Sequence, residues 1–284
     1  MADWQSAVQF KSVVQYAMVS QQTQRRWAWL EFALHSLPHA YGRVFLQQMA
    51  LRHPLRTARG LWAYWHAAAD DRAAQRALST PSEATWITRA THAGERLLVA
   101  TGFCQKPLRT AAGTSGCPAG RFNHECQYLS PLELGAIREA PLHPACAICP
   151  IRALGYAALQ AGASFAILTS ALDIAQDILL PSLQEQRFTQ VLFAICPYSL
   201  EPMSLALLVC GLDGYLFSYE AGACGDYAQW LRADRGDKPE QTTLSAPTAT
   251  SLLYLLQTIA AGRAEAGLWQ PTDYQLQGNV FRPM

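Results

Sequence analysis

Cysteine is missing from the first 103 residues of this 284-residue chain, although five of its eight cysteines fall between residues 104 and 149. The two common nucleotide fingerprints, G-x-G-x-x-G and G-x-x-x-x-G-K, do not occur in the sequence, so no dinucleotide or P-loop site is indicated. There is also no tight cluster of lysine and arginine and no recognised nucleic-acid motif. We therefore expect no nucleic-acid partner.

Signals for export or membrane insertion are lacking as well. The opening MADWQSAVQF has an early acidic residue and not the charged-then-apolar layout of a signal peptide, so we expect a cytoplasmic protein. Two uncharged stretches, 153–172 and 241–262, are long enough to raise the question of a membrane span. The first contains two glycines and several polar residues, and the second is rich in Thr, Ser and Gln in its first half, so we expect no transmembrane segment.

Half of the residues are apolar, which is enough for a sizeable core. The net charge of +1 is unevenly spread, because residues 1–125 carry 14 Lys and Arg against 7 Asp and Glu, while the rest of the chain is acidic. Solvated faces or a charge-matched contact between the two halves explain this distribution more simply than a charged partner does.

The segment from residue 103 to residue 150 is rich in turn formers and poor in apolar periodicity, so something other than a core must hold it together. Thiolates bind soft and borderline metals, and a loop that closes on a metal gains folding free energy. An iron-sulfur cluster, a structural zinc ion and free or redox-switched thiols all remain open as readings of this segment. Disulfides are disfavoured because nothing marks secretion.

Cysteine spacing favours the iron-sulfur reading. Cys146 and Cys149 form a C-x-x-C pair, which suits zinc and iron-sulfur clusters alike. A Cys-Pro step, which closes the ligand run of bacterial ferredoxins, occurs three times in the chain. A second C-x-x-C pair or finger-spaced histidines, which zinc sites usually have, are missing. The candidate metal ligands are Cys104, Cys117, Cys126, Cys146 and Cys149. The last four are preferred for a 4Fe-4S cluster, with zinc as the alternative.

Apolar spacing predicts helices from residue 3 to about residue 100, with Thr80 and Pro81 at the start of a helix that reaches Ala100. After Pro150 helices alternate with short buried strands, at Ser164–Leu168, Val191–Ile195 and Tyr215–Tyr219. The sequence therefore predicts an α/β fold in three regions: a helical region 1–102, a Cys-rich metal loop 103–150, and an α/β domain 151–284. Its sheet is expected to be small, parallel and Rossmann-like.

Ligands of parallel α/β sheets bind beyond the carboxyl ends of the strands. The side chains expected at those ends are candidates for binding a cofactor or small molecule: Thr169, Ser170, Asp173, Cys196 and Cys224. Asp173 also fits the first turn of a helix capped by Ser170. His124 is either a proton carrier close to the metal or an ordinary loop histidine. Cys210 is expected to be a buried small hydrophobe.

The run GCPAGRFNHEC at 116–126, with Cys104 before it and CAICPIRAL after it, resembles an uncharacterised Cys-rich family, the domain of unknown function one hundred and sixteen. The buried strand that ends in Ile195-Cys196-Pro197 and the Gly-x-Cys at Cys224 are similar too, so the resemblance covers about residues 104–230. It implies a cysteine-rich, metal-binding protein of anaerobic-type metabolism with no established reaction.

The reading that follows is an iron-sulfur protein, active in electron transfer or in a redox or sulfur-handling reaction at a 4Fe-4S cluster. Its partner would be an unknown redox protein or small molecule. A zinc-stabilised binding or scaffold protein without catalysis is the alternative. The sequence does not decide whether the protein is an enzyme.

Overall fold

The computed structural model describes residues 27–66, 75–79, 82–108, 116–139 and 141–284. Its centre is a seven-stranded sheet with the order β1-β5-β4-β2-β3-β7-β6. The strands are β1 (Gln75–Ala77), β2 (Leu97–Gly102), β3 (Ser164–Leu168), β4 (Gln190–Ile195), β5 (Asp213–Ser218), β6 (Tyr274–Gln277) and β7 (Val280–Pro283). The fold is therefore α/β, as the sequence predicts.

The four central strands, β5, β4, β2 and β3, are parallel, and their residues are buried almost throughout. A parallel sheet covered on both faces needs such apolar runs, because neither face meets water. The three outer strands are antiparallel to their neighbours. The expected parallel arrangement is thus confirmed for the four central strands. The whole sheet is mixed, and with seven strands it is larger than the small sheet that was predicted.

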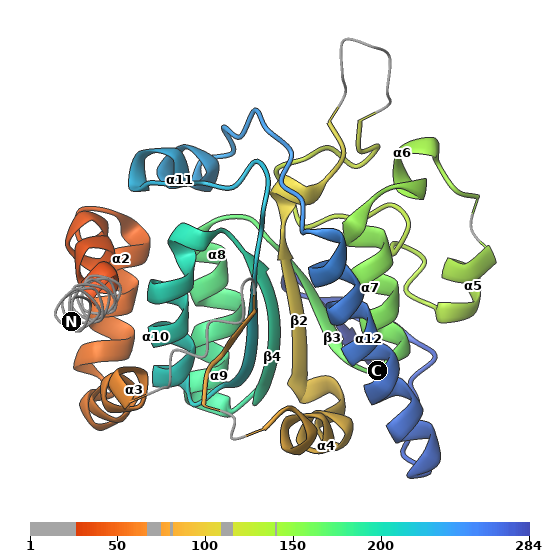
Figure 1. Ribbon diagram of the computed structural model, residues 1–284, viewed down its shortest axis with the longest axis horizontal. Helices are drawn as coiled ribbons and strands as arrows, with labels where there is room; N and C mark the ends of the chain where they lie inside the picture. Colours follow the sequence, from red (N-terminus) through yellow and green to blue (C-terminus); the bar gives the residue numbers. More distant parts are fainter. Residues whose placement is uncertain (1–26, 67–74, 80–81, 109–115, 140) are drawn as a thin grey trace, which may run out of the picture.

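Helices cover both faces of the sheet in layers (Figure 1). One face carries residues of α4 (Glu83–Ala93), α7 (Pro150–Gln160) and α12 (Ala246–Glu265). The other carries the continuous run α8 (Ala171–Ile174), η4 (Ala175–Leu179) and α9 (Leu180–Glu185), together with α10 (Leu200–Cys210). Short helices η2 (Gly94–Arg96), η3 (Phe103–Gln105), α5 (Leu134–Glu139), α6 (Pro144–Ala147), η5 (Pro197–Ser199) and α11 (Tyr227–Asp234) lie in the connections.

The N-terminal helices form an outer layer over α10 (Figure 1). They comprise helical residues 27–36, α2 (Ala40–Val44), the π-helical η1 (Phe45–Leu51) and α3 (Pro54–His66). A Cβ atom on Gly60 of α3 would come within 2.5 Å of the Val209 side chain on α10. Glycine at this position therefore lets α3 and α10 approach closely.

The helix predicted to reach Ala100 is shorter than expected. It starts after Ser82, whose hydroxyl accepts a hydrogen bond from the Thr85 N–H, and it ends at Ala93. Gly94 then turns the chain at a φ of 57°, and Leu97–Gly102 form the central strand β2. The prediction was wrong here because an apolar run this short fits a buried strand as well as a helix. The Thr80 and Pro81 cap lies outside the described residues.

The later elements follow the prediction closely. β3 has the predicted bounds, β4 and β5 overlap their predicted ranges, and helices alternate with these strands as predicted. Pro181 lies inside the continuous run of α8, η4 and α9, shortly after the π-helical η4 ends at Leu179. The helix predicted before residue 27 lies outside the described residues. None of the helices in the described ranges has the length and apolarity needed to cross a membrane.

Candidate functional site

Strands β2 and β4 are neighbours, but the chain leaves them in opposite directions. From β2 it passes through α7 to β3, and from β4 it passes through α10 to β5, with the two helices on opposite faces. Such a reversal opens a crevice beyond the carboxyl ends of the two strands, where ligands of doubly wound sheets bind. Cys104 follows β2 in η3, and Cys196 follows β4, so both thiols lie at this crevice.

Cys224 joins these two residues, and we call Cys104, Cys196 and Cys224 the switch-point thiols. The Cys224 N–H donates to Cys196 Sγ over 3.3 Å, and the Cys196 thiol also interacts by hydrogen bonding with the thiols of Cys104 and Cys224. Thr242 Oγ1 donates to Cys104 Sγ over 3.0 Å. All three cysteines are buried and unbridged.

These contacts shift the pKa values of the three thiols in different directions. Hydrogen bonding from Cys196, reinforced by Thr242 and by the nearby charge of Lys238, lowers the pKa of Cys104 against the cost of burial. The same hydrogen bond raises the pKa of Cys196 to about 11. Hydrogen bonding to Cys196 and burial also raise the pKa of Cys224. Cys104 is therefore the thiol of this group most readily ionised, which makes it the natural nucleophile.

Tyr219 fixes the strand ends on which these thiols sit. Its buried hydroxyl donates to the Ala194 carbonyl over 2.6 Å and accepts from the Gly102 N–H over 2.7 Å. It also lies 3.0 Å from Thr101 Oγ1. One side chain that follows β5 thus ties the end of β2 to the end of β4.

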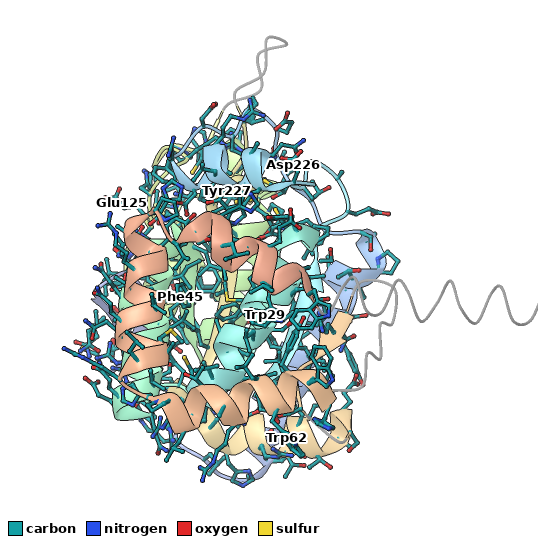
Figure 2. The ribbon with its side chains drawn as sticks, turned by 90° about the vertical axis from the view of Figure 1, so that its left-hand side faces the viewer. Trp29, Phe45, Trp62, Glu125, Asp226 and Tyr227 are labelled. Atoms are coloured by element: carbon teal, nitrogen blue, oxygen red, sulfur yellow. The ribbon has the colours of Figure 1, made fainter. Side chains whose placement is uncertain are left out.

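A cavity of about 360 Å³ leads from the N-terminal helices to the switch-point thiols. Figure 2 looks onto these helices, and the labelled Trp29 and Phe45 lie within the frame that they form. The cavity is lined mainly by apolar side chains of residues 29–61 and of α10, and at its other parts by Cys104, Cys196 and Cys224. Asp234 and Lys238 are its charged lining residues. Its size and lining are those of a small-molecule site.

The other four cysteines of the Cys-rich segment form a second group, the loop thiols: Cys117, Cys126, Cys146 and Cys149. All four line one cavity of about 10 Å³, together with Lys106, Glu125 and Arg152. Cys146 is in α6 and Cys149 is the N-cap residue of α7, so the C-x-x-C pair stands where the loop rejoins the α/β fold. The four preferred ligands are brought together, whereas Cys104 lies with the switch-point thiols instead.

Burial disfavours ionisation of three of the loop thiols, Cys126, Cys146 and Cys149. It raises the pKa of Cys126 to about 11 and also raises the pKa of Cys146 and of Cys149. Lys106 is buried beside them, and its Nζ donates to the backbone oxygen of Asn123 over 3.0 Å and to its side-chain oxygen over 2.5 Å. Burial lowers the pKa of Lys106, while the nearby thiols oppose this shift.

Within the described residues, no group of three or more His, Cys, Asp or Glu side chains is arranged so that it could hold a metal ion as it stands. The loop thiols surround a small space without forming a ready coordination sphere. Their chemistry nonetheless fits the group that the sequence predicts, because four thiolates are the usual ligands of iron-sulfur clusters and of structural zinc.

The remaining predicted residues lie at the end of β3. Ser170 and Asp173 form a reciprocal capping box at the start of α8. Thr169 Oγ1 donates to Asp173 Oδ2 over 2.5 Å and lies 2.9 Å from His124 Nε2. Burial opposes ionisation of Asp173, but hydrogen bonds from Thr169 and Ser170 outweigh it and lower the pKa. Thr169 lines the large cavity, whereas Asp173 serves the helix cap.

Arg121 links the two thiol groups. Its guanidinium donates to the Cys104 carbonyl over 3.2 Å and to the Glu240 carbonyl over 2.9 Å. Burial lowers the pKa of Arg121, and the negative charges of Cys104 and Cys117 oppose this shift. Arg121, Lys106, Lys238 and Tyr219 were not singled out from the sequence. Only the position of Lys106 and Arg121 inside the Cys-rich segment could have pointed to them.

Comparison of the chain with protein-family models, with curated proteins and with solved structures gives no match. The resemblance to the Cys-rich family therefore stays a prediction.

Proposed function

We propose that the protein is an iron-sulfur protein whose loop thiols, Cys117, Cys126, Cys146 and Cys149, hold a 4Fe-4S cluster. The observation that carries the proposal is that four cysteines spread over 33 sequence positions line a single cavity. Cys126 and Cys149 pack in the hydrophobic core, as free thiols commonly do, but packing alone does not require four thiols around one space in a turn-rich segment. An iron-sulfur cluster would account for all four.

Lys106 supports this proposal through charge. A cluster with four thiolates is anionic, and burying it requires a nearby positive charge. The Lys106 ammonium is buried next to Cys117, Cys126 and Cys149. Its hydrogen bonds to Asn123 hold it in place, so a positive charge is already present where negative charge would collect. Arg152 lines the same cavity and adds a second cation.

When bound, the cluster would supply one-electron transfer, and the surrounding residues would set its potential and its access to water. Lys106 and Arg152 would favour the more negative, reduced state. Arg121 would connect the loop to the switch-point thiols, where a redox partner molecule could react. The protein's task would be electron transfer or a redox or sulfur-handling reaction, with an unknown redox protein or small molecule as partner.

The space between the loop thiols bears on the choice of metal. A cavity of about 10 Å³ holds about one water molecule, so a cluster of four irons and four sulfides requires the loop around Cys117 to open outward. A single zinc ion would need less rearrangement. This compactness favours the second candidate function, a zinc-stabilised binding or scaffold protein.

Visible spectroscopy with metal analysis separates the two candidates. Protein purified without oxygen should be brown and contain about four irons and four sulfides per chain. Cys149→Ser should lose the colour and most of the iron. Cys210→Ser is the matched control, because Cys210 is equally buried but bonds to the Leu179 carbonyl, away from both thiol groups. A colourless protein with about one zinc per chain would replace the iron-sulfur proposal with the zinc one.

A further inference from the structure

The large cavity and the switch-point thiols have no role in holding metal at the loop thiols, yet they are joined to each other. We propose that this cavity binds an apolar two-electron carrier of the quinone class, and that Cys104 and Cys196 exchange two electrons and two protons with it. The site goes beyond the proposed iron-sulfur function and does not depend on it.

The lining of the cavity indicates an apolar ligand. Its walls come from two layers of the fold, the N-terminal helices and α10, and consist mostly of leucine, alanine, phenylalanine and methionine side chains. Its volume of about 360 Å³ lies in the range of drug-sized ligands. A nucleotide carrier such as nicotinamide dinucleotide would need several partners for its phosphates, and the cavity offers one buried lysine.

The thiols at the cavity supply the redox chemistry. Cys104 and Cys196 follow the ends of two paired neighbouring strands and line the same cavity, and each thiol shifts the pKa of the other. A dithiol-disulfide couple needs two thiols placed together in this way. Thr242 and Lys238 favour ionisation of Cys104, so one member of the pair is set up to attack. Cys224 contacts Cys196 through both its N–H and its thiol, which keeps the second member in position.

The reaction balances with no reactant other than the two thiols and the quinone. Oxidation of the two thiols forms one S–S bond and releases two electrons and two protons. A quinone accepts both and becomes a quinol, and the reverse reaction regenerates the thiols. Quinones are flat, apolar two-electron carriers, so they suit a cavity whose walls include the aromatic rings of Phe32, Phe103 and Trp230.

A carbonyl-bearing ligand also suits one polar group of the wall. Trp29 lines the cavity, and its indole N–H is buried without a hydrogen-bond partner in the described part of the chain. A buried N–H that bonds to nothing costs free energy, and a carbonyl oxygen of a bound ligand would satisfy it. Figure 2 labels Trp29 among the side chains framed by the N-terminal helices.

The test is oxidation of the full-length, fully reduced protein by two fully substituted benzoquinones, one with a decyl tail and one with a methyl group in its place. Full substitution prevents the thiols from adding to the ring. We expect the decyl quinone to react at least about tenfold faster, because only its tail gains binding energy from the cavity. Peptide mapping should find the new disulfide between Cys104 and Cys196, with quinol formed in equal amount.

Variants of cavity residues test whether the faster reaction of the decyl quinone comes from binding of its tail in the cavity. Ala33→Phe and Ala50→Phe place extra volume on two half-buried lining residues and should remove the advantage of the decyl tail. Ala58→Phe on the exposed face of α3 is the matched control and should keep it. Trp29→Phe should weaken saturation by the decyl quinone several-fold through loss of the indole donor.

Several outcomes would overturn the proposal. Equal rates with both quinones would show that the cavity does not bind the carrier. A disulfide among the loop thiols, or binding of the decyl quinone with all thiols still reduced, would remove electron exchange from this site. Iron and zinc are measured on the same samples, so a failure of the metal proposal is seen separately from a failure of this one.

Discussion

The two thiol groups of this protein differ in the elements that position them. The switch-point thiols follow buried parallel strands, and their backbone is tied by Tyr219 and by the sheet itself. The loop thiols are supplied by turns, by the four-residue helix α6 and by the start of α7. The first group is therefore positioned by strand ends. The second is positioned by turns and short helices, although Cys126 and Cys149 pack in the same core cluster as the first group.

Because the two thiol groups are positioned differently, they suit different chemical roles. Thiols held rigidly by strand ends can stay in contact with each other in the absence of a ligand, as a redox pair requires. Under the proposed function, the thiols on turns would gain their arrangement from the metal, and metal binding would stabilise the loop. The chain would then combine a preformed thiol site with a metal-dependent one, and Arg121, which lies in the loop, donates to the Cys104 carbonyl of the preformed site.

If the loop thiols hold a metal as proposed, its removal should have the largest effect, and that effect should be confined to the loop. A chelator that strips the loop thiols should speed amide exchange in residues 116–126 and 141–149, corresponding to a loss of about 3 kcal/mol of local stability. Exchange in β2 and β4 should change little, because the core holds those strands. The measurement is amide exchange by mass spectrometry on metal-loaded and stripped protein. Equal acceleration in both regions would mean that the two groups are not independent.

Tyr219→Phe tests how rigidly the switch-point thiols are held. It leaves the Ala194 carbonyl and the Gly102 N–H without their partner, so we expect a loss of about 1–3 kcal/mol in the free energy of unfolding. Urea unfolding measures the loss, and Tyr254→Phe is the control because that ring is 61% exposed. The metal content should not change. A loss of metal without a loss of global stability would reverse the roles given to the two groups.

Lys106→Met should act on the loop thiols alone. It removes the buried cation, so the reduction potential of the proposed cluster should fall and the thiols should hold the cluster more weakly. Two oxygens of Asn123 also lose a donor, at a cost of about 1–2 kcal/mol. Lys106→Arg retains the charge and should keep most of the potential. Redox titration followed by visible absorbance measures the shift. A potential that rises or stays constant would contradict the charge argument.

Thr242→Val should have the smallest effect, at the switch-point thiols. It removes the hydrogen bond that helps to lower the pKa of Cys104, so that pKa should rise and stability should fall by about 1 kcal/mol. A thiol whose pKa is lower in the folded than in the unfolded protein stabilises the fold at pH values above the unfolded-state pKa. This contribution is lost as the pH falls through the folded-state pKa. The variant should therefore lose less stability than the parent protein over this pH window.

Unfolding at a series of pH values, with thiolate absorbance, measures this difference. Thr250→Val is the control, because its exposed hydroxyl bonds only to the Ala246 carbonyl within its own helix. An unchanged thiolate titration in Thr242→Val would show that Cys196 alone sets the acidity of Cys104.

Much of the α/β part was predictable because local pattern and tertiary role agree there. Ser164–Leu168 is a short apolar run between a glycine turn and a Ser170 cap, and it forms β3 with those bounds. The strand Leu97–Gly102 was missed because it follows a helix of similar composition, and only pairing with β3 and β4 decides its conformation. The antiparallel strands at 274–283 are likewise defined by pairing with β3.

The gathering of the cysteines was predictable in part. Spacing identified the four loop thiols, because a C-x-x-C pair and two upstream cysteines in a turn-rich segment have few alternatives. Cys196 and Cys224 were predicted to lie at the ligand-binding edge because they follow predicted strands. Cys104 was assigned to the wrong neighbours because β2 was not recognised, and its position depends on that strand. The cavity depends on how two layers pack, which no local pattern encodes.

The placement of the Cys-rich segment between two adjacent parallel strands has a consequence for how the chain folds. β2 pairs with β3, but the chain between Gly102 and Ser164 must close before any of those hydrogen bonds form. Closing so long a connection is slow and entropically costly. A metal that gathers the loop thiols early would shorten the effective connection, so the supply of metal during synthesis would set how fast the central strands of the sheet come together.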